Sequence, residues 1–207
     1  MILETVKVGP MQVNCYVLAS RPGGRAIIID PGDDVSKIRA VLRGHNLTPE
    51  MVVNTHGHYD HIGADDEFGV SVYVHRDDLE MLKDPEKNLS SIFSAACKVH
   101  SRIEILEEDD LVRLDDIELR VVHLPGHTPG GIGLLMEKPQ KGIIFTGDTL
   151  FYRGIGRSDL SGGDPEKIED SLRNKLFVLP PETKVYPGHG PATTIGREND
   201  GCLPRAQ

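Results

Sequence analysis

The chain has 207 residues, of which 38% are hydrophobic and 27% charged, and its formal net charge at pH 7 is −9. This balance is ordinary for a globular protein that buries a core. No apolar run approaches the roughly 20 residues of a membrane span, and the acidic surface disfavours nucleic acid as a partner. Residues 1–9 alternate apolar and polar side chains and lack the pattern of a signal peptide. We therefore expect one cytoplasmic domain over residues 1–207, with no membrane or nucleic-acid partner.

The first part of the chain predicts strands followed by a helix. Residues 13–18 and 25–30 have the composition of strands, and the Pro- and Gly-containing segment 21–24 forms a turn between them. Residues 31–34 then offer a helix cap. Apolar side chains recur at helical spacing over 35–44, where a glycine ends the predicted helix.

The middle of the chain is less regular. Short apolar segments predict strands at 51–54 and 70–74, and a helix is expected to begin near His61. The spacing of apolar residues predicts a further helix over 76–83. Residues 84–100 fit no clear pattern, and the sequence leaves open whether they form regular structure or a mobile connection.

The second half repeats the arrangement of the first. Four short apolar segments are interpreted as successive strands: 111–114, 117–124, 132–136 and 142–145. Asp164 and Pro165 predict a helix start, Val185 begins a last short strand, and the polar tail after Ile195 is expected to fray. This layout predicts an α/β fold of the αββα type, in which two mixed sheets pack face to face with helices outside.

The densest polar motif follows the predicted strand at 51–54. His56, His58, Asp60 and His61 place three imidazoles and one carboxylate within six residues, which is a dense set of N and O ligands for a divalent metal. His56 and His58 are two residues apart, so extended backbone points both side chains the same way, while Asp60 and His61 lie past a bend. A single histidine is often a structural residue, but this clustering favours a metal site.

Three further candidates lie far along the chain. His127 and His189 sit in glycine-flanked loops after predicted strands, and Asp148 ends the apolar segment that precedes it. Loops at strand ends are where a rigid scaffold presents ligands. The other four histidines are interpreted as structural or solvent-facing: His45, His75, His100 and His123. The three widely spaced cysteines are expected to be reduced thiols: Cys15, Cys97 and Cys202.

The HxHxDH motif, followed by a distant His, Asp and His in that order, resembles the metallo-β-lactamase superfamily. The resemblance covers nearly the whole chain, including the Ile-Asp-Pro-Gly element at 29–32, and the segments 147–151 and 156–160 are similar to the glyoxalase II group. It implies a ligand set for two metal ions: His56, His58 and His127 for the first, Asp60, His61 and His189 for the second, and Asp148 as a bridge between them. It also implies that Asp30 supports a ligating histidine and is not itself a ligand.

The resemblance implies hydrolysis by a metal-bound hydroxide. Two ions about 3.5–4 Å apart activate a water between them, and one of them polarises the substrate carbonyl. Asp60 and Asp148 are the predicted catalytic residues, with Asp60 orienting the hydroxide or taking its proton. An N/O ligand set suits Zn, which we prefer, and also Fe or Mn.

The predicted substrate is a small-molecule thioester of the hydroxyacylglutathione type. Tyr59 is a candidate for contact with this substrate, with packing as the alternative. Tyr152, Arg153 and Arg157 follow the bridging aspartate, and an Arg fork matches a carboxylate. The alternative for Arg157 is an ion pair with a loop carboxylate such as Asp159.

One departure from the glyoxalase II pattern weakens the expected substrate but not the expected reaction type. Full-length glyoxalase II carries a C-terminal helical domain that helps hold glutathione, whereas here 18 residues follow His189, and as a segment they are too polar to form such a domain. The reaction type is therefore the firmer expectation. An alternative is a mononuclear iron persulfide dioxygenase, similar through the loop at 156–159, which would use His56, His127 and Asp148 alone. A non-catalytic metal-binding module is a third possibility, and the intact ligand set argues against it. The sequence does not predict the oligomeric state.

Overall fold

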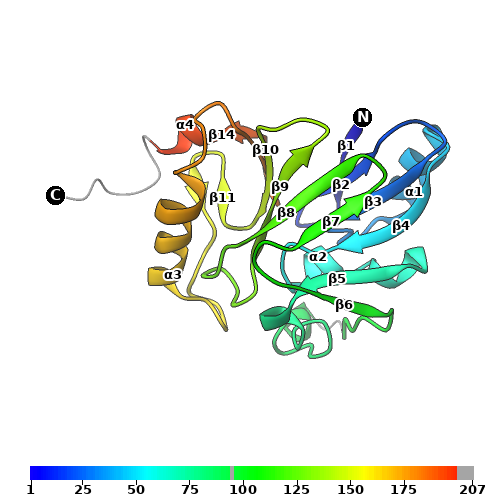
Figure 1. The fold of residues 1–207 in the computed structure, drawn as a ribbon. Coiled ribbons are helices and arrows are strands. Elements are labelled where there is room, and N and C mark those ends of the chain that lie inside the picture. The colour runs from blue at the N-terminus through cyan, green and yellow to red at the C-terminus, as the bar shows by residue number, and fades with distance from the viewer. Residues whose placement is uncertain (94–95, 200–207) are drawn as a thin grey trace.

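The computed structural model describes residues 1–93 and 96–199. Two six-stranded mixed sheets lie against each other, and helices cover their outer sides (Figure 1). The predicted αββα sandwich is therefore confirmed. Predicted and observed strand ends agree to within a few residues.

The first sheet contains the N-terminal half of the chain. Its strands, in spatial order, are β1 (Ile2–Val8), β2 (Val13–Ala19), β3 (Arg25–Ile29), β4 (Thr48–Val53), β5 (Ser71–His75) and β6 (Ile103–Leu106). Strands β1 to β3 are antiparallel, and β3 to β6 are parallel. Parallel neighbours end at the same edge, so the loops after β3, β4 and β5 lie together.

The second sheet comes from the C-terminal half. Its order is β14 (Thr193–Thr194), β13 (Lys184–Pro187), β10 (Ile143–Gly147), β9 (Ile132–Lys138), β8 (Ile117–His123) and β7 (Leu111–Leu114). All neighbours are antiparallel except β10 and β13. A small hairpin of β11 (Leu150–Phe151) and β12 (Gly154–Ile155) follows β10.

The main core fills the space between the two sheets. Tyr16 and Ile27 of the first sheet pack in one cluster with Leu119 and Phe145 of the second. Every residue of β2 is buried, because its other face lies under the helix α1 (Val35–Gly44). Burial on both faces explains why this strand reads as a nearly continuous apolar run instead of an alternating one.

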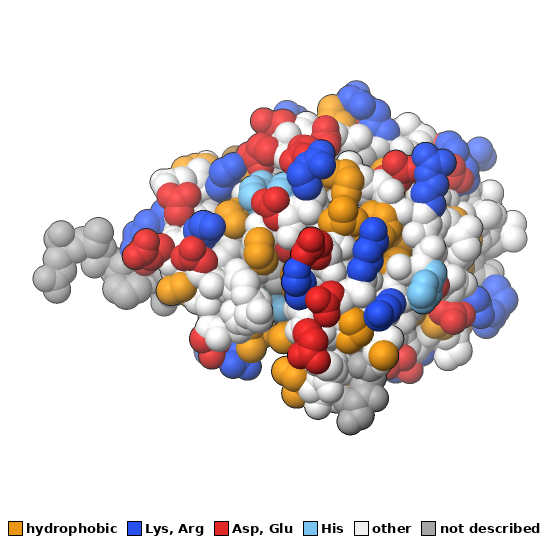
Figure 2. Space-filling view, turned by 90° about the horizontal axis from the view of Figure 1, so that it is seen from below, with side chains coloured by type: hydrophobic (Ala, Val, Ile, Leu, Met, Phe, Trp, Pro, Cys, Tyr) orange, Lys and Arg blue, Asp and Glu red, His pale blue; other side chains and the backbone are white. Residues whose placement is uncertain are grey.

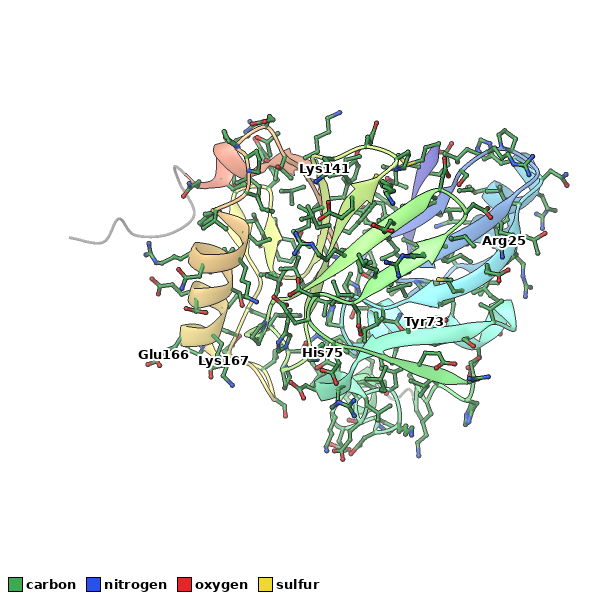
Figure 3. All side chains as sticks on the ribbon, viewed as in Figure 1. Arg25, Tyr73, His75, Lys141, Glu166 and Lys167 are labelled. Atoms are coloured by element: carbon green, nitrogen blue, oxygen red, sulfur yellow. The ribbon has the colours of Figure 1, made fainter. Side chains whose placement is uncertain are left out.

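Two helical segments cover the outer faces. Helix α1 buries Ile38 and Leu42 against the first sheet. Helix α3 (Pro165–Asp170) continues into the π-helical turn η4 (Ser171–Leu176), and its apolar side packs on the second sheet. Glu166 and Lys167 lie on the outward side of α3 (Figure 3). Among the described residues, no helix is long and apolar enough to cross a bilayer.

The caps of α1 and α3 differ. Asp164 accepts hydrogen bonds from the backbone N–H groups of Glu166 and Lys167, as its position before Pro165 predicts. The predicted cap at 31–34 does not form in this way. Asp34 precedes α1 in a left-handed conformation, and its carboxylate accepts from Gly9 N and Lys37 Nζ instead of capping the helix.

The predicted helix over 76–83 is wrong. The chain forms the short 3₁₀ helix η2 (Arg76–Asp78) and then turns. His75 Nδ1 accepts from Asp77 N, and the Asp78 carboxylate is drawn into the protein by backbone N–H groups of two other loops. These tertiary contacts override the helical spacing of the apolar residues.

Other local structure went unpredicted or differs in length. The helix near His61 is a single turn, α2 (Tyr59–Ile62). Within 84–100 the structure shows the 3₁₀ turn η3 (Ser90–Phe93), and residues 94–95 lie outside the described residues. Another 3₁₀ turn, η1 (Asp65–Phe68), follows α2.

The tail forms the short helix α4 (Ile195–Asn199), and the remainder of the tail, with Cys202, lies outside the described residues. Cys15 and Cys97 are free thiols.

The surface mixes charges of both signs. On the face seen in Figure 2, basic and acidic side chains are interspersed with scattered hydrophobic ones. Several exposed ion pairs contribute to this mixture. Arg25 at the start of β3 (labelled in Figure 3) pairs with Asp115 in the turn after β7, at 2.6 Å, and so links the two sheets at their surface.

Candidate metal centre

All seven predicted ligands converge at one end of the sandwich. They come from loops at the carboxyl ends of four strands: His56, His58, Asp60 and His61 after β4, His127 after β8, Asp148 after β10, and His189 after β13. Because β4 belongs to the first sheet and the other three strands to the second, the centre lies where the two sheets meet.

The first group contains His56, His58 and His127, whose nitrogens lie within 4.8 Å of one another. His58 Nδ1 is 3.0 Å from His127 Nε2. His127 Nδ1 donates to the backbone oxygen of Arg157 at 2.7 Å, which leaves the lone pair of its Nε2 facing His58. This is the tautomer that a metal ligand requires.

The second group contains Asp60, His61 and His189. His189 Nε2 lies 3.4 Å from Asp60 Oδ2, while its Nδ1 donates to the backbone oxygen of Met11 at 3.0 Å. Asp148 lies between the groups. Its Oδ1 is 3.5 Å from His61 Nε2, and its Oδ2 is 3.6 Å from His127 Nε2 and 3.5 Å from His189 Nε2.

This donor set fits divalent ions. Ligand atoms at about 2.0–2.1 Å from a tetrahedral Zn²⁺ lie about 3.3–3.4 Å from each other, and the five pairs of ligand atoms described above lie 3.0 to 3.6 Å apart. In addition, His56 Nε2, His61 Nε2 and Asp148 Oδ1 are buried without a hydrogen-bond partner. An unsatisfied buried polar atom costs about 1–3 kcal/mol, and a bound cation would satisfy all three.

Asp30 supports the second group. Its carboxylate accepts from both the N–H and the hydroxyl of Thr55 at 2.7 Å, and its Oδ2 lies 3.0 Å from His61 Nδ1. With Nδ1 beside Asp30, the other ring nitrogen of His61, Nε2, faces Asp148. The seven predicted ligands form three overlapping groups that could hold a metal ion, and Asp30 belongs to none of them.

Sequence reasoning missed Asp78. This fully buried carboxylate accepts from Gly57 N at 2.9 Å, from Thr128 Oγ1 at 2.7 Å and from Gly130 N at 2.6 Å. It therefore ties the loop of His56 and His58 to the loop of His127. No local signal marks it, because its partners lie between 21 and 52 residues away.

Two glycines permit the close packing of the centre. A Cβ at Gly188 would overlap Asp148 Oδ1 and crowd the ring of His61. A Cβ at Gly57 would crowd Met81. Gly57 is thus required by close approach and not by a left-handed turn, the other reason for a glycine in this motif.

The electrostatics of the side chains suit metal binding. Burial lowers the pKa of His56, and burial together with His127 lowers the pKa of His58 to about 3, so both stay neutral. Burial alone would lower the pKa of His61, but Asp148 and Asp30 outweigh it and raise that pKa to about 10. Burial favours a higher pKa for Asp60, but His61 and His189 hold it below its usual range. Neutral imidazoles and ionised carboxylates are the ligating forms, so His56, His58 and Asp60 are ready to ligate, whereas His61 has to lose a proton when an ion binds.

A cavity of about 590 Å³ opens beside Asp60, Asp148 and His189. Tyr59 and Arg157 are among its lining residues, and their contact with substrate stays a prediction. Arg157, however, is already paired with Asp159 through two contacts of 2.9 Å, the alternative that the sequence left open.

Tyr152 and Arg153 are not among the described residues that line the cavity. The Tyr152 hydroxyl accepts from Arg197, and the backbone N–H of Arg153 donates to Glu198. Their role in substrate binding stays a prediction: in this structure the hairpin of β11 and β12 places them in contact with α4.

The remaining described histidines agree with structural roles. His75 lies at the end of β5 (Figure 3), and its ring stacks on His123 with centroids 4.0 Å apart and planes at 14°. His123 Nε2 donates to the backbone oxygen of Pro129 at 2.9 Å. Nearly parallel rings cannot both aim an in-plane lone pair at one ion, although Asp77 lies close to both. His45 pairs with Glu4, and His100 is exposed.

Comparison with known proteins places this geometry in a wider group. A family model described as the metallo-beta-lactamase superfamily matches residues 8–189. An uncharacterized protein of Mycobacterium tuberculosis is 41% identical, with 96% of this chain and 95% of the relative covered. Probable metallo-hydrolase YqgX of Bacillus subtilis is 35% identical over 93% and 92% of the two chains. Hydroxyacylglutathione hydrolase GloC of Haemophilus influenzae is 33% identical over 96% and 95%.

Solved structures are also similar to this chain over most of its length. The B3 metallo-beta-lactamase BLEG-1 superposes with a TM-score of 0.88 and 36% identity, covering 96% of this chain and 97% of the other. TTHA1623 in a di-iron-bound form gives a TM-score of 0.80 and 36% identity over 95% and 96%. ETHE1 from Myxococcus xanthus gives 0.75 and 27% over 96% and 82%. Each match spans both sheets and the centre between them.

Proposed function

Because the chain belongs to the metallo-β-lactamase superfamily, we propose that it is a metal-dependent hydrolase of small-molecule thioesters of the hydroxyacylglutathione type. The observation that carries the proposal is the position of Asp148, whose two carboxylate oxygens lie 3.5–3.6 Å from nitrogens of both donor groups. We propose that His56, His58 and His127 hold one ion, that Asp60, His61 and His189 hold a second, and that Asp148 contacts both.

Two bound divalent ions would supply Lewis acidity to the substrate carbonyl and lower the pKa of a coordinated water. The protein's own residues fix the geometry. Asp148 is held between the two groups, and Asp60 lines the cavity, where its carboxylate can orient the attacking water and accept its proton. Water adds to the carbonyl carbon and the C–S bond breaks, giving a carboxylate and a thiol and releasing one proton.

The described cysteines do not offer an alternative nucleophile. Cys15 is fully buried and burial raises its pKa well above the usual value, while burial raises the pKa of Cys97 to about 11. A reactive cysteine needs a thiolate near neutral pH. Attack by water is therefore the mechanism that this site supports.

The thioester substrate is supported by a relative. GloC of Haemophilus influenzae, described as a hydroxyacylglutathione hydrolase, aligns over 96% of this chain and 95% of its own. The matching test is release of thiol from S-lactoylglutathione, followed with a colour reagent before and after chelation. We expect release by the metal-loaded protein and its loss on chelation. No release from this or any simpler thioester would refute the proposal.

A second candidate is the mononuclear iron persulfide dioxygenase that the loop at 156–159 resembles. The observation in its favour is that His127 Nε2 and Asp148 Oδ2 lie 3.6 Å apart and that His56 stands beside them, so one ion could be held without the second group. Oxygen uptake with glutathione persulfide, together with a single iron per chain, would identify this activity.

A further inference from the structure

The wall of the cavity beside the metal centre is strongly apolar. Apart from the predicted ligands, its lining consists of Tyr59, Arg157 and seven hydrophobic side chains: Met11, Leu89, Ile92, Phe93, Phe151, Ile155 and Leu160. These residues come from four separate parts of the chain, so the apolar wall is assembled by the fold and is not one hydrophobic stretch of sequence.

Part of this wall is exposed to water. Ile92 is 69% exposed and Phe93 is 56% exposed. Of the five large hydrophobic side chains exposed among the described residues, three belong to this one wall. Scattered exposed hydrophobic residues are normal, but their concentration at one cavity indicates a surface that a ligand covers.

The wall begins directly at the metal centre. Tyr59 lies between His58 and Asp60 in the sequence, and its ring packs on Phe93 with centroids 4.9 Å apart. A substrate whose carbonyl is at the metal centre therefore shares its cavity with this aromatic pair.

The charges of the cavity do not match glutathione. A glutathione conjugate carries two carboxylates and one ammonium group. Arg157 is the one Lys or Arg among the described residues of the lining, and both of its contacting nitrogens already pair with Asp159. A glutathione carboxylate that sought the same two nitrogens of Arg157 would compete with Asp159, which cancels part of the gain.

Resting on the thioester hydrolysis proposed above, but not on glutathione as the preferred thiol, we propose that this cavity takes thioesters with an uncharged, apolar group next to the scissile bond, in preference to glutathione conjugates. The apolar group packs along Phe93, Ile92 and Met11 while the carbonyl is held at the centre. Burial of methylene groups supplies the binding energy, so affinity rises with chain length until the wall is covered.

The test measures binding apart from catalysis. The probes are 2-oxoalkyl thioethers, in which a methylene separates the carbonyl from sulfur and hydrolysis is impossible. One series lengthens the acyl side on a small thiol, and the other lengthens the thiol side on an acetyl group. A third probe is the corresponding analogue of S-lactoylglutathione. Titration calorimetry on the metal-loaded protein gives each Kd.

We expect one series to bind roughly two- to fourfold more tightly for each added methylene, and its octyl member to bind more tightly than the glutathione analogue. The series that shows the effect identifies the side of the substrate that the wall contacts. Phe93→Ala should weaken the octyl probe about tenfold and change the shortest probe less than twofold. Val178→Ala is the matched control, because Val178 is 68% exposed and lies outside the cavity lining.

Three outcomes would overturn the inference: no dependence on chain length in either series, tighter binding of the glutathione analogue, or a change in oligomeric state in Phe93→Ala without a change in probe binding. The two proposals fail separately. Chain-length-dependent binding without thiol release from any thioester refutes the hydrolysis and leaves the apolar cavity standing. Thiol release without chain-length-dependent binding refutes the apolar cavity and leaves the hydrolysis standing.

Discussion

At the scale of single residues, the ligand-type side chains and the supporting Asp30 were predictable, whereas the supporting Asp78 was not. His56, His58 and Asp60 stand in a short motif, where spacing alone indicates shared chemistry. Asp78 carries no such mark. Its carboxylate is buried only because loops up to 52 residues away donate N–H groups to it, and the apolar residues around it read as a helix. Long-range hydrogen bonds of this kind leave no local periodicity in a sequence.

Asp148→Ala should be far more damaging than Arg157→Ala. Losing a carboxylate that faces both donor groups should lower kcat at least about 100-fold and reduce the metal content. Arg157→Ala removes an exposed side chain that is already paired with Asp159, so it should change KM by no more than a few-fold. Steady-state thioester hydrolysis and elemental analysis of both variants measure this. An Asp148→Ala variant with wild-type kcat would contradict the assigned role.

Asp78→Ala should destabilise the fold and weaken metal binding together. Three buried donors lose their acceptor, at about 1–3 kcal/mol for each unsatisfied group. Asp78→Asn keeps one carbonyl oxygen and should lose less. Asp77→Ala is the matched control, since that neighbouring carboxylate is 52% exposed. Urea unfolding and titration with Zn²⁺ give the two quantities. Equal unfolding midpoints for Asp78→Ala and the control would show that Asp78 is dispensable.

At the scale of elements, strands were predicted better than short helices. Strands β2 and β3 are central and buried, so their apolar runs are unambiguous. Strands β6 and β14, edge strands of four and two residues, were missed, although β7, an edge strand as short as β6, was predicted. Helix α3 was predicted from its N-cap residue. The helix predicted over 76–83 did not form, because η2 ends at Asp78, whose carboxylate is buried and accepts hydrogen bonds from two other loops.

Asp164→Ala should destabilise the protein by about 1 kcal/mol, the usual contribution of an N-cap side chain. The expectation follows from the two backbone N–H groups that this carboxylate accepts. Glu166→Ala, on the outward side of the same helix, is the control and should change the free energy of unfolding by less than about 0.5 kcal/mol. Chemical denaturation resolves the difference, and identical midpoints would argue that the cap contributes nothing.

At the scale of the whole molecule, the layered arrangement followed from alternating strands and helices, and a family resemblance supported it. The register between the sheets did not follow, because it depends on how Tyr16 and Phe145 interdigitate across the core. The apolar cavity was also beyond prediction. Its members, from Met11 to Leu160, meet only after both sheets are in place.

The fully loaded protein should contain about two divalent ions per chain, and chelation should lower its Tm. Ions that bind only the folded state stabilise it in proportion to the logarithm of their concentration over Kd, about 2.7 kcal/mol at a hundredfold excess over Kd. Elemental analysis and thermal unfolding with and without chelator test this. One ion per chain at saturation would contradict the two-ion proposal and favour the dioxygenase.

The loop of His189 is tied to the beginning of the chain. Its ring donates to the backbone of Met11, a contact that spans 178 residues, and the neighbouring Gly188 accepts from Asn14 N. During synthesis the first sheet emerges from the ribosome long before this loop does, at about 5–20 residues per second. A nascent chain can therefore present the motif from His56 to His61 while the partners of that motif are still untranslated. On the two-ion proposal, capture of both ions is then among the last events of biogenesis, and a chain interrupted before His189 would carry histidines without the closing contact.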